Sequence, residues 1–130
     1  ADYYDEIGLG IDFTARDLQD KLKEKGQPWE LAKAFDNSAV VGHFLPKSQF
    51  VSMADIVFSL QKNGQLVQTG NSKDLIFTFD YLIEYISKYF TLQTGDLIYT
   101  GTPAGVGAVK PGDKLEGYLG EELMFFCEVK

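Results

Sequence analysis

The sequence predicts an α+β domain that is rich in β-structure, with antiparallel or mixed sheets and a few short helices. Short stretches of alternating apolar residues recur between glycine, proline and Asn-Gly signals, which is typical of strands joined by turns. Fewer stretches carry apolar residues at helical spacing, and the predicted order is β, α and then mostly β. With 45% apolar and 24% charged residues, the 130-residue chain has enough apolar content for the core of one domain, residues 1–130.

The first predicted elements are a strand and a helix that meet at Asp12. Apolar residues alternate with small or polar ones over residues 7–13, so one face of this strand is core and the other is nearly bare. Thr14 offers an N-cap hydroxyl for the helix that follows, and Gly26 is a suitable residue to end it. A second short helix is predicted over residues 29–35.

The middle of the chain predicts a strand, a hairpin and a longer helix. One strand is predicted over residues 39–44, and another over residues 56–60 runs towards Asn63-Gly64, the strongest short signal for a hairpin turn. Thr78 is predicted to cap a helix with a core-facing stripe. The stripe consists of Phe79, Leu82, Ile83, Ile86 and Phe90.

A glycine-rich loop over residues 101–107 follows an apolar stretch, residues 96–100, that predicts a strand. Backbone N–H groups exposed by small residues, together with the Thr102 hydroxyl, would suit an anionic oxygen. The loop has neither the Gly-Lys-Ser/Thr of a Walker A motif nor the G-x-G-x-x-G spacing, which argues against a nucleotide phosphate. A plain connection between strands is the alternative. Two closing strands are predicted over residues 115–118 and 123–129.

Polar residues are predicted to converge where the first strand meets its helix. Arg16 and Gln19 follow one helical face close to Asp12, and the second helix carries Lys33. Asp12 could supply one oxygen ligand to Mg²⁺, while the two cations would orient a substrate with a carboxylate or carbonyl group. The alternative is a solvated surface, on which Asp12 satisfies helix N–H groups and Arg16 pairs with an aspartate of its own helix.

Composition argues against several classes of partner. A net charge of −7 without a basic stripe argues against nucleic acid or an anionic membrane surface. Cys127 is the only cysteine, so neither a disulfide within the chain nor a cysteine zinc site is predicted. No leader and no apolar run of spanning length is recognised, and we expect a soluble, cytoplasmic protein.

Three stretches carry a resemblance to a known family: Gly10–Gln19, Trp29–Asp36 and Gly95–Gly107. In this order and spacing they resemble the fumarylacetoacetate hydrolase superfamily, and the resemblance covers essentially the whole chain. Within that superfamily the chain is most similar to the small acylpyruvase and oxaloacetate decarboxylase type. The fold that the resemblance implies is a β-roll with layered sheets.

The resemblance also implies an enzyme that cleaves a C–C bond in a 2-oxo acid or a 1,3-dicarbonyl acid, with Mg²⁺ (or Mn²⁺ or Ca²⁺) as cofactor. Asp12 matches a metal ligand. Four residues match positions that contact the substrate's carboxylate and keto oxygens: Arg16, Gln19, Lys33 and Thr102. The metal would stabilise the enolate that forms when the bond breaks, and Lys33, as a catalytic residue, would add a second positive charge there. Members of the family commonly form homodimers.

The chain departs from the family pattern in one respect. Members carry a Glu-x-Glu pair that completes the metal site, ahead of the strand that ends in the aspartate, and these 130 residues contain no Glu-x-Glu. A single carboxylate would hold Mg²⁺ weakly. We therefore expect the chain to be the C-terminal, substrate-side part of such an enzyme, with little or no activity alone. Two alternatives stay open: a non-catalytic binding domain that retains the fold, and an isomerase of the same superfamily.

Overall fold

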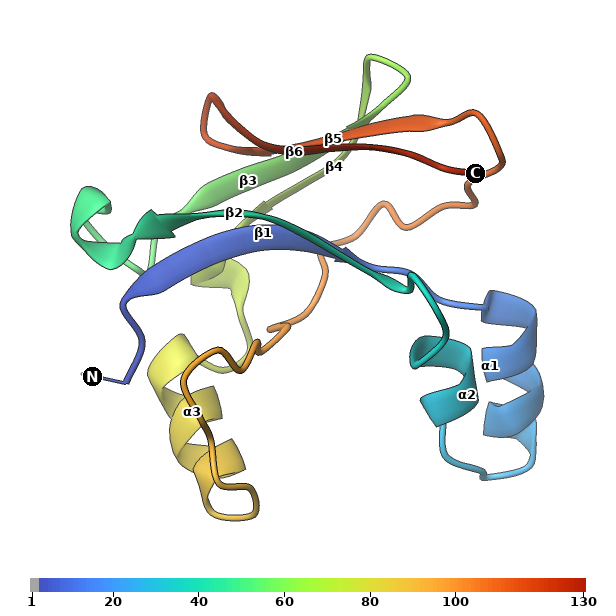
Figure 1. The fold of residues 1–130 in the computed structure, drawn as a ribbon, viewed down its shortest axis with the longest axis horizontal. Helices are drawn as coiled ribbons and strands as arrows, with labels where there is room; N and C mark the ends of the chain where they lie inside the picture. Colours follow the sequence, from blue (N-terminus) through green and yellow to red (C-terminus); the bar gives the residue numbers. More distant parts are fainter. Residues whose placement is uncertain (1–2) are drawn as a thin grey trace.

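The computed structural model describes residues 3–130, which form two antiparallel sheets and several short helices (Figure 1). The strands are β1 (Glu6–Asp12), β2 (Ala39–Pro46), β3 (Val57–Lys62), β4 (Gln65–Asn71), β5 (Lys114–Leu119) and β6 (Glu122–Glu128). The α-helices are α1 (Arg16–Glu24), α2 (Glu30–Lys33) and α3 (Phe79–Ser87), with single 3₁₀ turns at Lys47–Gln49 and Ser72–Asp74. The predicted α+β class, dominated by sheet, is confirmed.

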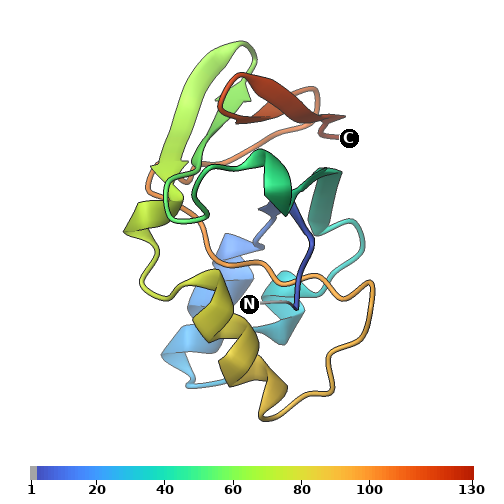
Figure 2. The same ribbon diagram turned by 90° about the vertical axis from the view of Figure 1, so that its left-hand side faces the viewer.

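The elements are arranged in layers, which Figure 1 and Figure 2 show from two sides. The upper layer is the four-stranded sheet in the order β4-β3-β5-β6, and the pair β1-β2 forms the middle layer. The three α-helices lie on the far side of β1-β2, with α1 and α2 together at one end and α3 at the other. The C-terminal end of β1 therefore leads directly into the helical layer, where the candidate site lies.

The hydrophobic core lies between the two sheets. Its buried members are Ile56, Leu119, Met124 and Phe125, and half-buried residues of β1 and β2 pack against them. Gly42 of β2 lies at a close approach of the layers, because a Cβ at this position would be 2.5 Å from the Met124 carbonyl oxygen and 2.9 Å from the Leu9 carbonyl oxygen. No side chain fits there, so glycine lets β2 lie against both β1 and β6.

The predicted hairpin is confirmed, with β3 and β4 joined at Asn63-Gly64. Both turn residues have left-handed φ values, 53° and 77°, as a type I′ turn requires. The Asn63 side-chain amide donates to the buried Asp113 carboxylate (2.9 Å) and its oxygen accepts from the Lys114 N–H (2.9 Å), which ties the hairpin to β5. The hydrogen bond from Asn63, together with one from the Lys110 N–H, lowers the pKa of Asp113.

Two of the helix starts illustrate different solutions to the unpaired N–H groups of a first turn. α3 begins as predicted after Thr78, whose hydroxyl accepts from the Tyr81 N–H (3.2 Å). At α1 the predicted cap is wrong: Ala15 occupies the N-cap position without a side-chain hydrogen bond. The Thr14 hydroxyl instead accepts from the Lys33 ammonium at 2.7 Å, because a charged donor forms the stronger hydrogen bond.

The other helix boundaries are close to the predictions. α1 ends just before Gly26, which has a left-handed φ of 62°. α2 spans a single turn, Glu30–Lys33, and is shorter than the predicted residues 29–35. No α-helix within residues 3–130 is long and apolar enough to cross a membrane.

The strand predicted over residues 96–100 is wrong. From residue 88 to residue 113 the chain forms neither helix nor strand. A strand requires a neighbouring strand to pair its backbone N–H and C=O groups, and within the described residues this segment is not part of either sheet. The segment is instead a long connection that passes from α3 beneath β1-β2 to β5 (Figure 1).

The apolar stripe of α3 is less buried than predicted. None of the residues within α3 is fully buried, and Phe90, beyond the end of the helix, is 68% exposed. The helix and β1 line a common cavity of about 290 Å³, so the space between them is not filled by side chains. The stripe therefore lines part of this cavity and is not fully buried.

Candidate active site

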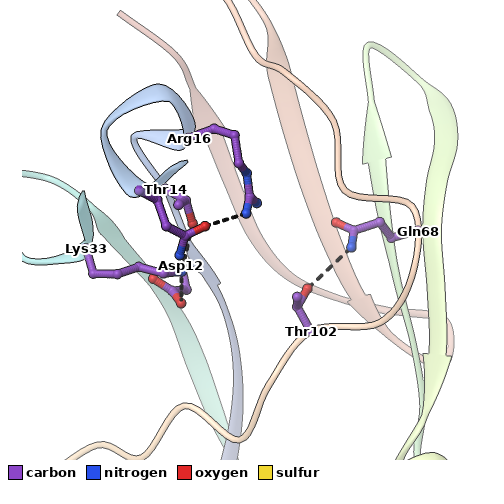
Figure 3. Close-up of polar contacts among 7 residues, drawn as sticks. Asp12, Thr14, Arg16, Lys33, Gln68 and Thr102 are labelled. Atoms are coloured by element: carbon purple, nitrogen blue, oxygen red, sulfur yellow. Dashed lines mark hydrogen bonds and ion pairs between the residues drawn. The ribbon is translucent and has the colours of Figure 1, made fainter. Parts of the chain in front are cut away.

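Asp12 and Lys33 form the centre of the candidate site, at the end of β1. The Lys33 Nζ atom lies 2.7 Å from the Asp12 Oδ2 atom and 2.7 Å from the Thr14 Oγ1 atom (Figure 3). The Ala15 N–H donates to the Ala32 carbonyl oxygen (3.0 Å), and Ala32 is completely buried, so the start of α1 is fixed against α2. This contact places the residue after Ala32, which is Lys33, beside the end of β1.

Arg16 and Gln19 extend this group along the first turn of α1. The Arg16 guanidinium donates to the Gln19 Oε1 atom at 2.6 Å, and Gln19 is only 8% exposed. Asp12 and Arg16 are both exposed, and among residues 3–130 no hydrogen bond or ion pair joins the Asp12–Lys33 pair to the Arg16–Gln19 pair. Within the described residues Arg16 forms no ion pair with an aspartate of its own helix, and Asp12 binds the Lys33 ammonium rather than helix N–H groups.

Thr102 lies on the glycine-rich loop, across from this group (Figure 3). It makes no direct hydrogen bond to the Asp12 group, and its hydroxyl oxygen accepts from the Gln68 side-chain amide of β4 at 3.3 Å. The same amide donates to the Pro103 carbonyl oxygen at 3.1 Å. In the view of Figure 3 the Arg16 guanidinium extends from the Asp12 group towards the side of Gln68 and Thr102.

Tyr99 connects the same loop to the strand that ends at Asp12. Its hydroxyl donates to the Val40 carbonyl oxygen at 2.7 Å, and Val40 pairs with Ile11. A Cβ at Gly10 would lie 2.8 Å from the Tyr99 hydroxyl oxygen, so the bare face of β1 is where the tyrosine packs. Burial, and secondly the negative charge of Asp12, raise the pKa of Tyr99 above its ordinary value.

We expect Tyr99→Phe to lower the free energy of unfolding by about 1 kcal/mol at neutral pH, because the Val40 carbonyl loses its hydrogen bond. Since the folded protein holds the pKa of Tyr99 above 10.0, the contribution is complete below that pH and is lost as the pH rises through the raised value. Urea unfolding at about pH 8 and about pH 11 measures both effects. The difference between the two proteins should shrink at the higher pH.

Tyr89→Phe is the matched control, because Tyr89 is 68% exposed at the end of α3. It should leave the free energy of unfolding unchanged at both pH values. Equal stability of Tyr99→Phe and the unaltered protein near pH 8, or a difference that grows with pH, would contradict the role assigned to the Tyr99 hydroxyl.

Two residues of this neighbourhood, Gln68 and Tyr99, were not identified from the sequence. Gln68 has no motif of its own, since a glutamine on a hairpin strand is common and its partner loop lies 34 residues away. Tyr99 belongs to the apolar stretch that the alternation pattern assigned to a strand. The signal for Tyr99 was the bare face of β1 at Gly10. A strand face without side chains indicates that another part of the chain packs against it, but it does not identify the residue that does so.

The side chains present supply only part of a site for a divalent metal ion. Asp12 is exposed enough to act as a ligand, with a side chain that is 48% exposed. Within the described residues, no three histidine, cysteine, aspartate or glutamate side chains are grouped so that they could hold a metal ion. Divalent cations in proteins are usually bound by more than one anionic oxygen or by several waters and substrate oxygens. Asp12 therefore fits one ligand position, and residues 3–130 do not make a complete metal site.

Comparison with known proteins places this arrangement in a family. The family described as "Fumarylacetoacetate (FAA) hydrolase C-terminal" matches residues 4–125. The chain is 48% identical over 115 residues to oxaloacetate tautomerase FAHD1, mitochondrial, of Rattus norvegicus, and 47% identical over 109 residues to oxaloacetate tautomerase YcgM of Escherichia coli K12. These matches cover 88% and 83% of this chain, and 52% and 50% of the relatives. The chain thus spans about half the length of the curated relatives it matches.

Solved structures agree with the sequence comparison. A fumarylacetoacetate hydrolase family protein from Yersinia pestis CO92 superposes with a TM-score of 0.91 at 40% identity, covering 97% of this chain and 58% of that one. Fumarylpyruvate hydrolase from Pseudomonas aeruginosa, solved in complex with Mn²⁺ and pyruvate, superposes with a TM-score of 0.80 at 42% identity. That match covers 86% of this chain and 48% of the hydrolase.

The chain is therefore similar, in sequence and in fold, to proteins whose names are those of enzymes. The family match extends over nearly the entire chain, and the structural matches are made at 40% identity or more. On this basis the chain belongs to the fumarylacetoacetate hydrolase family.

Proposed function

We propose that this chain supplies the substrate-binding part of an enzyme that acts on a small 2-oxo acid or 1,3-dicarbonyl acid. The observation that carries the proposal is that Lys33 forms an ion pair with Asp12 at the end of β1, while Arg16, in the first turn of the helix that follows, is hydrogen-bonded to Gln19. A guanidinium matches the two oxygens of a carboxylate, and an ammonium acts as a point charge on one oxygen. A substrate with a keto group next to a carboxylate presents both kinds of acceptor.

Lys33 is proposed as the residue that stabilises charge on the keto oxygen. Its ammonium has three N–H donors, and the contacts to Asp12 and Thr14 use two of them. The third donor is available to a substrate oxygen. A fixed cation at this oxygen favours the negative charge that develops when the neighbouring carbon loses a proton or a carbon substituent. Lys33 therefore supports enolate formation whichever group leaves.

Gln19 and Thr102 are proposed to orient the substrate. The Gln19 oxygen already accepts from Arg16, so its amide N–H groups are the part of the side chain that is left to donate. The hydrogen bond from Arg16 and the burial of Gln19 hold the Gln19 side chain in place. Thr102 would donate from the loop on the other side of the bound acid.

We propose Mg²⁺ or Mn²⁺ as the cofactor, with Asp12 as one of its ligands. The Mn²⁺ in the Pseudomonas aeruginosa fumarylpyruvate hydrolase supports a divalent metal for this family. When bound, such an ion supplies Lewis-acid stabilisation of negative oxygens. Because no three histidine, cysteine, aspartate or glutamate side chains of residues 3–130 are grouped to hold a metal ion, we propose that residues 1–130 alone have little or no activity.

The reaction is proposed to proceed through an enolate, and two outcomes are consistent with that. One is cleavage of a C–C bond, as in acylpyruvate hydrolysis or oxaloacetate decarboxylation. The second is tautomerisation of oxaloacetate, which is favoured by the names of the rat and Escherichia coli relatives at 48% and 47% identity. Both place negative charge on the same keto oxygen, so the contacts of Lys33 serve either.

The proposal is tested with the protein expressed from its complete reading frame. Purified protein with Mg²⁺ or Mn²⁺ is incubated with oxaloacetate, following the enol absorbance and the release of CO₂, and separately with acetylpyruvate, following pyruvate. We expect turnover of at least one substrate that stops when the metal is chelated. A folded protein that turns over neither substrate and binds no 2-oxo acid contradicts the proposal. Binding without turnover would favour the non-catalytic alternative.

We also propose a homodimer. The support is that large apolar side chains remain exposed outside the candidate site, among them Ile76 at 89% and Phe90 at 68%. Light scattering coupled to size exclusion measures the mass directly, and a monomer at working concentration would contradict the proposal.

The cytoplasmic location stays a prediction from the single cysteine, while the name of the rat relative includes the word mitochondrial.

A further inference from the structure

The loop that carries Thr102 has no regular secondary structure of its own, and its position depends on contacts with β4. The Gln68 amide donates to the Thr102 hydroxyl oxygen (3.3 Å) and to the Pro103 carbonyl oxygen (3.1 Å). Gly105, with a left-handed φ of 98°, lies so close to β4 that a Cβ would be 2.4 Å from the Val67 carbonyl oxygen. The loop is therefore held against one strand, and Gln68 is the side chain that reaches Thr102.

The partners of Gln68 determine which way its amide faces. A backbone carbonyl only accepts hydrogen bonds, so the group that faces Pro103 must be the NH₂ of Gln68. The same NH₂ lies at the Thr102 hydroxyl, which must accept from it, since an amide nitrogen is only a donor. The hydroxyl has one proton of its own. With its oxygen accepting from Gln68, that proton is left to donate to another acceptor.

We infer that Gln68 is a positioning residue for the proposed reaction: it makes the Thr102 hydroxyl a hydrogen-bond donor to an anionic oxygen of the substrate. The inference rests on the proposed function, in which Thr102 contacts a 2-oxo acid. The Gln68 amide is bound to the loop, through Thr102 and Pro103. Its contribution to substrate binding therefore passes through the Thr102 hydroxyl.

A double-mutant cycle tests this dependence in the protein expressed from its complete reading frame. Gln68→Met keeps the length of the side chain, introduces no charge and removes both N–H donors of the amide. We expect it to raise KM for the turned-over acid about tenfold, as the loss of one oriented hydrogen bond to a charged group does, with a smaller change in kcat. Thr102→Val removes the hydroxyl. In the Thr102→Val background, Gln68→Met should change KM less than about twofold, because the hydroxyl it positions is gone.

Three further variants separate positioning from general support of the loop. Thr102→Ser retains a hydroxyl, so the effect of Gln68→Met should be as large in that background as in the unaltered protein. Gln68→Asn keeps the amide but is one methylene too short to reach Thr102. It replaces Gln68→Met in the cycle if that variant does not fold, and it should have the same effect on KM. Gln65→Glu, at the exposed start of the same strand, should leave KM unchanged. Thermal unfolding of each protein shows that the fold is retained.

The outcomes also distinguish this inference from the function on which it rests. If the unaltered protein turns over no 2-oxo acid, the proposed function fails and the inference fails with it. If it turns over an acid, but Gln68→Met raises KM equally with and without the Thr102 hydroxyl, only the inference is overturned. The effect would then come from the Pro103 contact or from the loop as a whole. Strong coupling that is retained by Thr102→Ser supports the inference.

Discussion

Lys33→Met lowers kcat by about 100-fold or more while the protein keeps its fold, if Lys33 stabilises the charge that develops on the substrate. Removal of one preorganised donor to a developing oxyanion typically costs a factor of this size. The fold should tolerate the change because the ion pair with Asp12 is partly exposed, at 35% and 48% for the two side chains, and such pairs contribute about 1 kcal/mol or less to stability. Turnover and thermal unfolding of the complete-frame protein measure the two effects separately.

Two controls make the Lys33 result specific. Lys33→Arg retains the charge but changes its shape, so it should recover part of the lost rate. Lys21→Met removes a cation from the exposed side of α1 and should change kcat less than about twofold. If Lys33→Met retains most of the rate, or if Lys21→Met loses as much, the catalytic role of Lys33 is wrong.

Gly42→Ala should lower the free energy of unfolding by about 1–3 kcal/mol, because overpacking forces the backbone apart. The atoms that a Cβ would meet are the Met124 and Leu9 carbonyl oxygens, at 2.5 Å and 2.9 Å, and neither can rotate away as a side chain can. Adaptation requires β2 to move from β1 or from β6. Since β1 carries Asp12, we also expect reduced activity in the protein that remains folded.

Gly107→Ala provides the comparison for Gly42→Ala. A Cβ at Gly107 meets no atom within 4 Å, and this glycine does not have a left-handed φ. Its stability should stay within about 0.5 kcal/mol of the unaltered protein. Urea unfolding of the two variants side by side is the measurement. Equal stability of both variants would show that the layers can separate without cost, contrary to the packing described for β2.

Local patterns were sufficient for those elements whose contacts are local. The Asn63-Gly64 turn forms because both residues accept left-handed φ values. Thr78 caps α3 by accepting from the Tyr81 N–H, only three residues along the chain. The strand predicted at residues 96–100 does not form, for a reason that lies outside the segment. Its alternating side chains fit a strand, but strand formation also needs a partner for the backbone, which no pattern within the segment reveals.

The candidate site shows the same difference between local contacts and contacts between distant segments. Arg16 and Gln19 are three residues apart on one helix, so their meeting follows from helical geometry. Thr14 was assigned to the cap of α1, yet its hydroxyl is taken by Lys33, which is brought in by the packing of α2 on α1. The contacts of Gln68 and Tyr99 join segments 34 and 59 residues apart, and no spacing rule predicts such pairs.

A crystal structure of the complete-frame protein with Mn²⁺ and pyruvate tests the central claim most directly, since pyruvate carries the carboxylate and keto group of the proposed substrates. We predict that the metal binds Asp12, and that the pyruvate oxygens lie within hydrogen-bonding distance of Arg16, Lys33 and Thr102. Pyruvate bound elsewhere, or at this site without contact to either cation, would contradict the account.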